Sequence, residues 1–154
     1  MYNNTSKTGD IGEAVAIAEF VKHGITVLTP FGQNVPYDLV FENGGRFYRV
    51  QCKTIAKTTN GETMRFHICR TNGFTGEHTA YSENDVDYFF LYCIENGYAG
   101  LVPVSEANKR EFWIRIKPPK AATSNITHAA KDYHIEKQIK LLKEQKKNAA
   151  VVQW

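Results

Sequence analysis

The sequence predicts an α/β domain in which a mixed central β-sheet is flanked by helices. Three observations support this: a helical stripe near the start, several short strands in the middle, and a second helical stripe at the end. The chain has 154 residues, 42% of them hydrophobic, which is enough for one real core. We expect a single domain over residues 1–154, with a core over 10–118 and a C-terminal helical extension over 119–154.

The first helix is predicted over residues 10–23, after a polar and loosely held start, and Gly24 ends it. Its acidic pair, Asp10 and Glu13, has the spacing of a capping box, so both could simply close the helix. Gly12 favours another interpretation, because glycine weakens a helix by ~1 kcal/mol. A glycine here is better explained if another group approaches the backbone closely.

Strands are predicted from short apolar runs bounded by turn residues. The run over 86–94 is almost continuously apolar and suits a strand buried on both faces. A polar, glycine-rich stretch before it, 71–85, predicts a mobile loop. From about Asn125 the chain reads as an amphipathic helix. The other predicted strands cover 25–29, 37–42, 46–54, 63–70, 99–104 and 111–116.

The segment VPYDLVFENGGRFYRVQCKT places polar side chains on two strands that should form a hairpin. Gln51 and Lys53 share one face, because side chains alternate along a strand. A two-residue loop at 44–45 pairs Asp38 with Gln51, and a two-residue loop at 43–44 pairs it with Arg49 instead. Both loops put Asp38 on the face of Gln51 and Lys53.

A carboxylate, an amide and an ammonium group gathered in this way suit phosphodiester hydrolysis. Hard cations such as Mg²⁺ prefer carboxylate and carbonyl oxygens, with water and phosphate completing the shell. A lysine beside the metal can polarise the attacking water or neutralise phosphate charge. The alternative is an exposed sheet face with a Lys–Asp pair worth under ~1 kcal/mol.

The order G-D-I-G-E, P-Y-D-L-V, Y-R-V-Q-C-K resembles the PD-(D/E)XK nuclease superfamily, and most closely its small homing-endonuclease branch associated with group I introns. The resemblance implies a restriction-endonuclease-like core and a catalytic set of Glu13, Asp38, Gln51 and Lys53. It also implies Mg²⁺ or Mn²⁺ held by Glu13, Asp38, Gln51 and the backbone carbonyl of Cys52. Lys53 would then orient or activate the nucleophilic water.

Two positions depart from the general motif. Tyr37 stands where the motif name has proline, although Pro36 is adjacent. Gln51 replaces the usual acid, as in the branch named above. A neutral amide offers one carbonyl oxygen, so metal affinity should be lower unless Glu13 helps.

Basic side chains after the hairpin are candidates for contacts to phosphates or base edges. Each alone is equally consistent with a solvated strand face. The C-terminal lysine cluster over 137–147 could track phosphates, pack against a second subunit, or be only a solvated helix face. The DNA-binding candidates are Lys57, Arg65, His67, Arg70, His78 and Lys120.

We therefore expect a metal-dependent, site-specific DNA endonuclease acting on double-stranded DNA. Because one active site cuts one strand, a homodimer or homotetramer is expected. A Holliday-junction resolvase or repair nuclease with the same core is the closest alternative. A DNA-binding module that has lost cleavage is the alternative from another class, suggested by Gln51.

Composition removes several other classes. The net charge of +3 is too small for a broadly basic nucleic-acid protein. Three cysteines without a CxxC motif and five histidines without ligand spacing argue against zinc and indicate a reduced, intracellular protein. There is no apolar run of membrane-spanning length. We expect a cytoplasmic protein of prokaryotic or phage-like origin, with no membrane partner.

Overall fold

The structure is a computed structural model that describes residues 4–107, 110–118 and 128–151. Its helices are α1 (Asn4–Lys22), the short 3-10 helix η1 (Val104–Glu106), α2 (Ala130–Tyr133) and α3 (Ile135–Val151). Its strands are β1 (Thr26–Leu28), β2 (Leu39–Asn43), β3 (Arg46–Ile55), β4 (Thr63–His67), β5 (Cys69–Thr71), β6 (His78–Ala80), β7 (Tyr88–Cys93), β8 (Tyr98–Pro103), β9 (Glu111–Arg115) and β10 (His128–Ala129).

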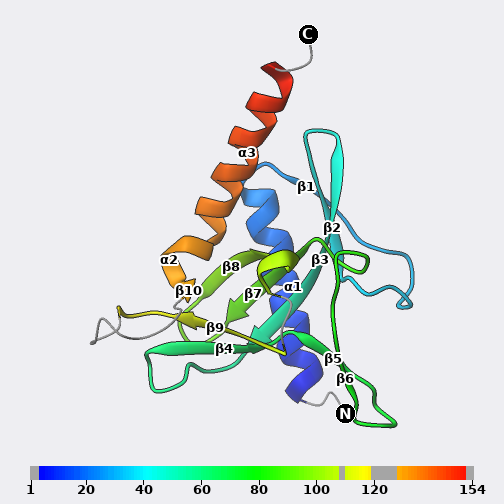
Figure 1. The fold of residues 1–154 in the computed structure, drawn as a ribbon, viewed down its shortest axis with the longest axis vertical. Helices are drawn as coiled ribbons and strands as arrows, with labels where there is room; N and C mark the ends of the chain where they lie inside the picture. Colours follow the sequence, from blue (N-terminus) through cyan, green and yellow to red (C-terminus); the bar gives the residue numbers. More distant parts are fainter. Residues whose placement is uncertain (1–3, 108–109, 119–127, 152–154) are drawn as a thin grey trace.

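The central sheet is mixed, as predicted. Its strand order is β1-β2-β3-β7-β8, with β3 and β7 parallel and the other neighbours antiparallel. A second sheet has the order β10-β9-β4, and β5 and β6 form a separate two-stranded ribbon. Figure 1 shows the central sheet between the helices and the smaller sheet.

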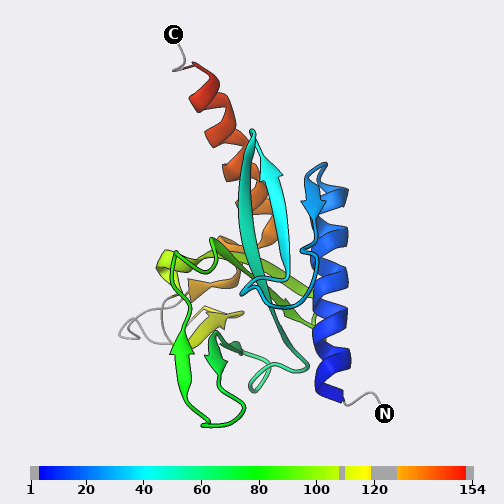
Figure 2. The ribbon, with the colours of Figure 1, turned by 90° about the vertical axis from the view of Figure 1, so that its right-hand side faces the viewer.

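The two faces of the central sheet are covered differently. On one face, Phe20 of α1 and Ile139 of α3 pack with Phe90 of β7 in one buried cluster. On the other face, Phe66 of β4 and Phe112 of β9 pack beneath the sheet in a second cluster. Figure 2 shows α1 on one side and the small sheet on the other. The layers are therefore helix, sheet, sheet.

The first helix starts earlier than the sequence predicted. It begins at Asn4, so Asp10 lies inside it and cannot be its N-cap. The capping-box interpretation of Asp10 and Glu13 is therefore wrong. Residues 4–8 are polar, but they continue an existing helix, and propagation adds a hydrogen bond for every residue fixed.

At Gly12, the backbone of α1 passes close to β3. A Cβ atom at this position would lie 1.7 Å from Oγ1 of Thr54. The sequence interpretation of a close approach to the backbone is thus confirmed, with Thr54 as the approaching residue. This contact sets Glu13, the next residue of α1, beside the same part of β3.

Two further segments differ from the predictions. The polar stretch 71–85 contains β6, which pairs with β5 through Thr71 opposite His78. The predicted C-terminal helix from about Asn125 is two helices, α2 and α3, and the first of them begins at Ala130 because His128 and Ala129 are extended and pair in parallel with β9. Residues 125–127 of that prediction lie outside the described residues. The apolar stripe of α3 lies in the protein's own core, where Ile135, Ile139 and Leu142 are buried.

Candidate active site

The β2–β3 hairpin positions three of the predicted side chains. Its two-residue loop is Gly44-Gly45, with φ of +65° and +78°, the left-handed geometry that glycine adopts without strain. Asn43 therefore pairs with Arg46 and Leu39 with Val50, and continuing this register places Asp38 opposite Gln51. The alternative loop at 43–44 is wrong.

Asp38 lies at the entrance of β2, half-buried and tied to the neighbouring strand. Its Oδ2 accepts a hydrogen bond of 2.7 Å from the backbone N–H of Cys52. Its own N–H donates to the carbonyl of Val50 at 2.9 Å. Burial raises the pKa of Asp38, and this Cys52 bond and the Lys53 ammonium offset part of the rise. The carboxylate is thus held in place and kept poorly solvated.

Glu13 approaches the same site from α1. Burial raises the pKa of its carboxyl, and the negative charge of Asp38 raises it further, followed by that of Asp10. Two carboxylates from different elements therefore repel each other across this space. A cation between them would remove that repulsion.

Gln51 and Cys52 add neutral oxygen donors next to these acids. The Gln51 amide lies against the Cys52 backbone carbonyl, with Nε2 at 3.5 Å from that oxygen. The described residues include no cluster of three or more His, Cys, Asp or Glu side chains suited to a metal. Two carboxylates, an amide and a carbonyl nevertheless form the hard-oxygen donor set that Mg²⁺ and Mn²⁺ accept, with water completing it. The residues present fit such an ion.

Lys53 is enclosed by an aromatic ring and a second cation. Its Nζ lies 5.2 Å from the ring centre of Tyr81, and the guanidinium of Arg70 lies 4.7 Å from the same centre. Arg70 in turn pairs with Asp85 at 2.5 Å. Burial lowers the pKa of Lys53, opposed by Asp38 and assisted by Arg70.

Sequence reasoning missed Tyr81 as a member of this site. The residue is buried, yet it lies in a stretch that reads as a polar loop. Its one signal was that it is one of two aromatic residues, with Phe74, in that stretch. The pairing of β5 with β6 brings the chain back toward the sheet, so that Tyr81, directly after β6, lies beside Lys53.

The DNA-binding candidates fall into separate groups. Arg65 and His67, on β4, both face Glu111, and Arg65 also lies over the Trp113 ring at 5.4 Å. Arg70 and His78 belong to the β5–β6 ribbon, where His78 Nδ1 is 3.0 Å from Thr71 Oγ1.

The remaining two candidates are not part of either group. Lys57 lies after β3, near Glu95, whose pKa its charge helps to lower. Lys120 lies outside the described residues. Among the described candidates, the structure thus brings only Arg70 into contact with the catalytic set, through Tyr81.

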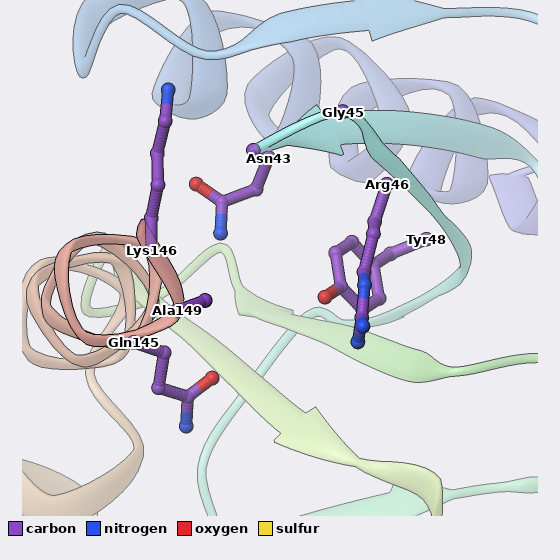
Figure 3. A pocket seen from close by; sticks show the side chains of 8 residues that line it. Asn43, Gly45, Arg46, Tyr48, Gln145, Lys146 and Ala149 are labelled. Carbon is purple, nitrogen blue, oxygen red and sulfur yellow. The ribbon is translucent and has the colours of Figure 1, made fainter. Parts of the chain in front are cut away.

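A groove elsewhere has a different character. About 330 Å³ in volume, it lies between the β2–β3 turn and α3 and is lined by Arg46, Tyr48, Gln145 and Lys146, among others (Figure 3). The turn is attached to α3 because Asn43 Nδ2 donates to the Leu142 carbonyl at 3.2 Å. The groove has a basic lining without a carboxylate, so it offers no metal chemistry.

The site combines an acid on a helix with an aspartate and a Gln-x-Lys pair on neighbouring strands of a mixed sheet. This combination defines a nuclease core. A model of the PD-(D/E)XK endonuclease family matches residues 3–136. The chain belongs to this family. It is therefore a nuclease that acts on DNA, and enzymes of this family generally use divalent metal ions.

Among solved structures, a bacterial homing endonuclease, I-Ssp6803I, is similar to this chain. The match has a TM-score of 0.69 and 26% identity, and covers 96% of this chain and 97% of that one. A comparison with curated proteins finds no match. Within the ranges described above, no helix is long and apolar enough to cross a membrane.

Proposed function

We propose that this protein is a site-specific DNA endonuclease of the homing type that depends on Mg²⁺ or Mn²⁺. The observation that carries the proposal is the position of Asp38, which accepts a hydrogen bond of 2.7 Å from the Cys52 N–H and lies near enough for its charge to act on both Glu13 of α1 and Lys53 of β3. The similarity to a bacterial homing endonuclease over almost the whole chain supports the homing type.

In this proposal Glu13, Asp38, the Gln51 side-chain oxygen and the Cys52 carbonyl hold the ion. When bound, the divalent ion supplies positive charge that activates water and neutralises the phosphate. Asp38 is kept in position by the Cys52 N–H. Glu13 is more exposed and suits a water-mediated contact or a second ion.

Lys53 provides the positive charge that the protein itself directs at the scissile phosphate. Its ammonium orients the attacking water or stabilises the charge that develops on the phosphate oxygens. The low-dielectric wall formed by Tyr81 strengthens this interaction. The products would carry a 5′-phosphate and a 3′-hydroxyl.

Binding of double-stranded DNA involves basic residues around this centre. We assign Lys57, Arg65, His67, Arg70, His78 and Lys120 to this role. Arg65 and Arg70 are each paired with an acid, so their contacts to DNA require that ion pair to open or to be shared. We further propose a single domain over 1–154 that works as a homodimer or homotetramer in the cytoplasm of a prokaryote or phage-infected cell.

The test is metal-dependent nicking of a supercoiled plasmid library with random inserts, because the target sequence is unknown. We expect wild type to nick with Mg²⁺ or Mn²⁺ and to stop when EDTA is added. Lys53→Ala should lose about 100-fold or more, while Lys22→Ala, at an exposed lysine paired with Glu19 at the end of α1, should retain cleavage. Equal nicking by wild type and Lys53→Ala would refute the assignment.

Gln51 supports a second candidate, a DNA-binding module without cleavage, since the amide lacks the charge of the usual acid. Gln51→Glu separates the two candidates. If the protein does not cleave DNA because this charge is absent, Gln51→Glu should nick the plasmid while wild type does not. If Gln51 is a working ligand, wild type already nicks. A preference for four-way junctions over duplex DNA would instead favour a resolvase.

A further inference from the structure

Two phenylalanine rings are completely exposed. The relative exposure is 108% for Phe31, in the β1–β2 loop, and 103% for Phe74, at the turn of the β5–β6 ribbon. Burying a phenylalanine side chain is worth about 1.5–3 kcal/mol. Covering both rings with a partner would therefore be favourable.

The ribbon turn presents Phe74 rigidly. Asn72 Oδ1 accepts hydrogen bonds from the N–H groups of Phe74 at 2.9 Å and Thr75 at 3.3 Å. The N–H of Gly76, with φ of +69°, donates to the Asn72 carbonyl at 2.8 Å. The backbone of the turn is closed by its own hydrogen bonds, and the ring projects from it.

Both segments start at the active site. The ribbon is bounded by Arg70 and Tyr81, which contact each other beside Lys53. The loop carrying Phe31 leads directly into Asp38. At roughly 3.5 Å per residue, Phe74 lies at most about 14 Å along the chain from Arg70, and Phe31 at most about 25 Å from Asp38. Figures 1 and 2 show the loop and the ribbon projecting on the same side of the molecule.

We propose that Phe31 and Phe74 are apolar wedges that contact and unstack bases of duplex DNA next to the scissile phosphate. The proposal rests on the nuclease function above. Proteins that kink DNA insert single apolar side chains between base steps in this way. The distances above correspond to a few base steps at about 3.4 Å each.

The surroundings of the rings favour DNA over a second copy of the chain. The exposed side chains around Phe74 are mostly polar and offer hydrogen bonds rather than an apolar patch; they include Thr71, Asn72, Thr75, Glu77, His78 and Thr79. Subunit interfaces of homodimers have a predominantly apolar core. Two-stranded ribbons also bind DNA in other proteins, with strands in the major or the minor groove.

The test uses the full chain and two fluorescein-labelled 30-base-pair duplexes, one fully paired and one with a central two-base mismatch, in EDTA so that no cleavage occurs. Wild type should prefer the mismatched duplex, because its bases cost less to unstack. Phe74→Ala and Phe31→Ala should each weaken binding roughly tenfold and reduce that preference. Phe74→Trp should retain both, and Val21→Ala, with its side chain 57% exposed on α1, should behave as wild type.

The salt dependence separates wedges from ionic contacts. Loss of a ring should leave the slope of log K against log salt unchanged, whereas loss of a phosphate-binding lysine lowers it by about 0.9. Wild-type affinity of both alanine variants for both duplexes would overturn the proposal. So would a changed oligomeric state, by sedimentation, with DNA binding intact. If DNA binding depends on the rings but the protein never nicks DNA, only the proposed nuclease function is refuted.

Discussion

At the scale of single residues, burial raises the pKa of the carboxyl groups of both Asp38 and Glu13, and the negative charge of Asp38 raises the pKa of Glu13 further. A raised pKa in the folded state gives stability that is present below the unfolded pKa, near 3.8 for Asp38. That stability is lost as pH rises through the folded value. The metal-free site is therefore a source of instability at neutral pH.

Asp38→Asn should consequently stabilise the metal-free protein, and the gain in the free energy of unfolding should grow as pH rises from 4 to 7. The amide oxygen can still accept the Cys52 N–H bond, while the charge is gone. We expect a gain of about 1 kcal/mol at pH 7 and little or none at pH 4, measured by urea unfolding in EDTA. Asp132→Asn, at an exposed ion pair on α2, serves as the control. A gain that is the same at both pH values would contradict the explanation.

Tyr81 acts as a positioning residue for Lys53 through its ring face. Tyr81→Leu should lower kcat about tenfold and leave the affinity for DNA unchanged, because the ammonium loses its cation–π contact. Tyr81→Phe should retain activity, since the ring remains. Steady-state cleavage of a sequence that the enzyme cuts, measured over a range of DNA concentrations, provides kcat and KM separately. Equal losses in both variants would show that the hydroxyl, rather than the ring, matters.

Much of the site at this scale was predictable from sequence. The alternation along a hairpin placed Asp38, Gln51 and Lys53 together, and the resemblance added Glu13. Tyr81 was not predictable, because its contact with Lys53 depends on how β5 and β6 return to the sheet. The ion pairs of Arg65 and Arg70 were also missed, because their acid partners are 46 and 15 residues away in sequence.

At the scale of elements, the packing of α1 on β3 places Glu13. Gly12→Ala should destabilise the protein by about 1–3 kcal/mol, because the new methyl group would overlap Thr54. Gly9→Ala in the same helix has nothing within 4 Å and should stabilise it by up to ~1 kcal/mol.

Thermal or urea unfolding measures both changes. Adding Thr54→Ala to Gly12→Ala should recover part of the loss, since it removes the overlapping hydroxyl. Equal effects of alanine at positions 9 and 12 would contradict the close contact.

Element boundaries were harder to predict than element types. The strands at 37–42, 46–54 and 86–94 were recognised because alternation or a continuous apolar run marks them. The early start of α1 was missed because residues 4–8 carry no apolar stripe. The strand β6 was missed because all three of its residues are exposed, so no hydrophobic pattern reveals it.

At the scale of the whole molecule, α3 belongs to the same core as α1 and the central sheet. Ile139→Ala and Leu142→Ala should each lower the free energy of unfolding by about 2–5 kcal/mol. Leu141→Ala, whose side chain is 42% exposed, should cost much less. We expect one cooperative transition by fluorescence and circular dichroism. Two separate transitions would contradict a single domain.

The central claim is that one divalent ion site is built by α1 and the β2–β3 hairpin. Its most direct test is calorimetric titration of Mn²⁺ into the wild type, Asp38→Asn and Asp85→Asn at pH 7.5. We expect Mn²⁺ to bind to the wild type and to Asp85→Asn, because the Asp85 carboxylate pairs with Arg70 rather than with the ion. We expect at least tenfold weaker binding by Asp38→Asn. Equal Mn²⁺ affinity in all three proteins would contradict an ion site at α1 and the β2–β3 hairpin.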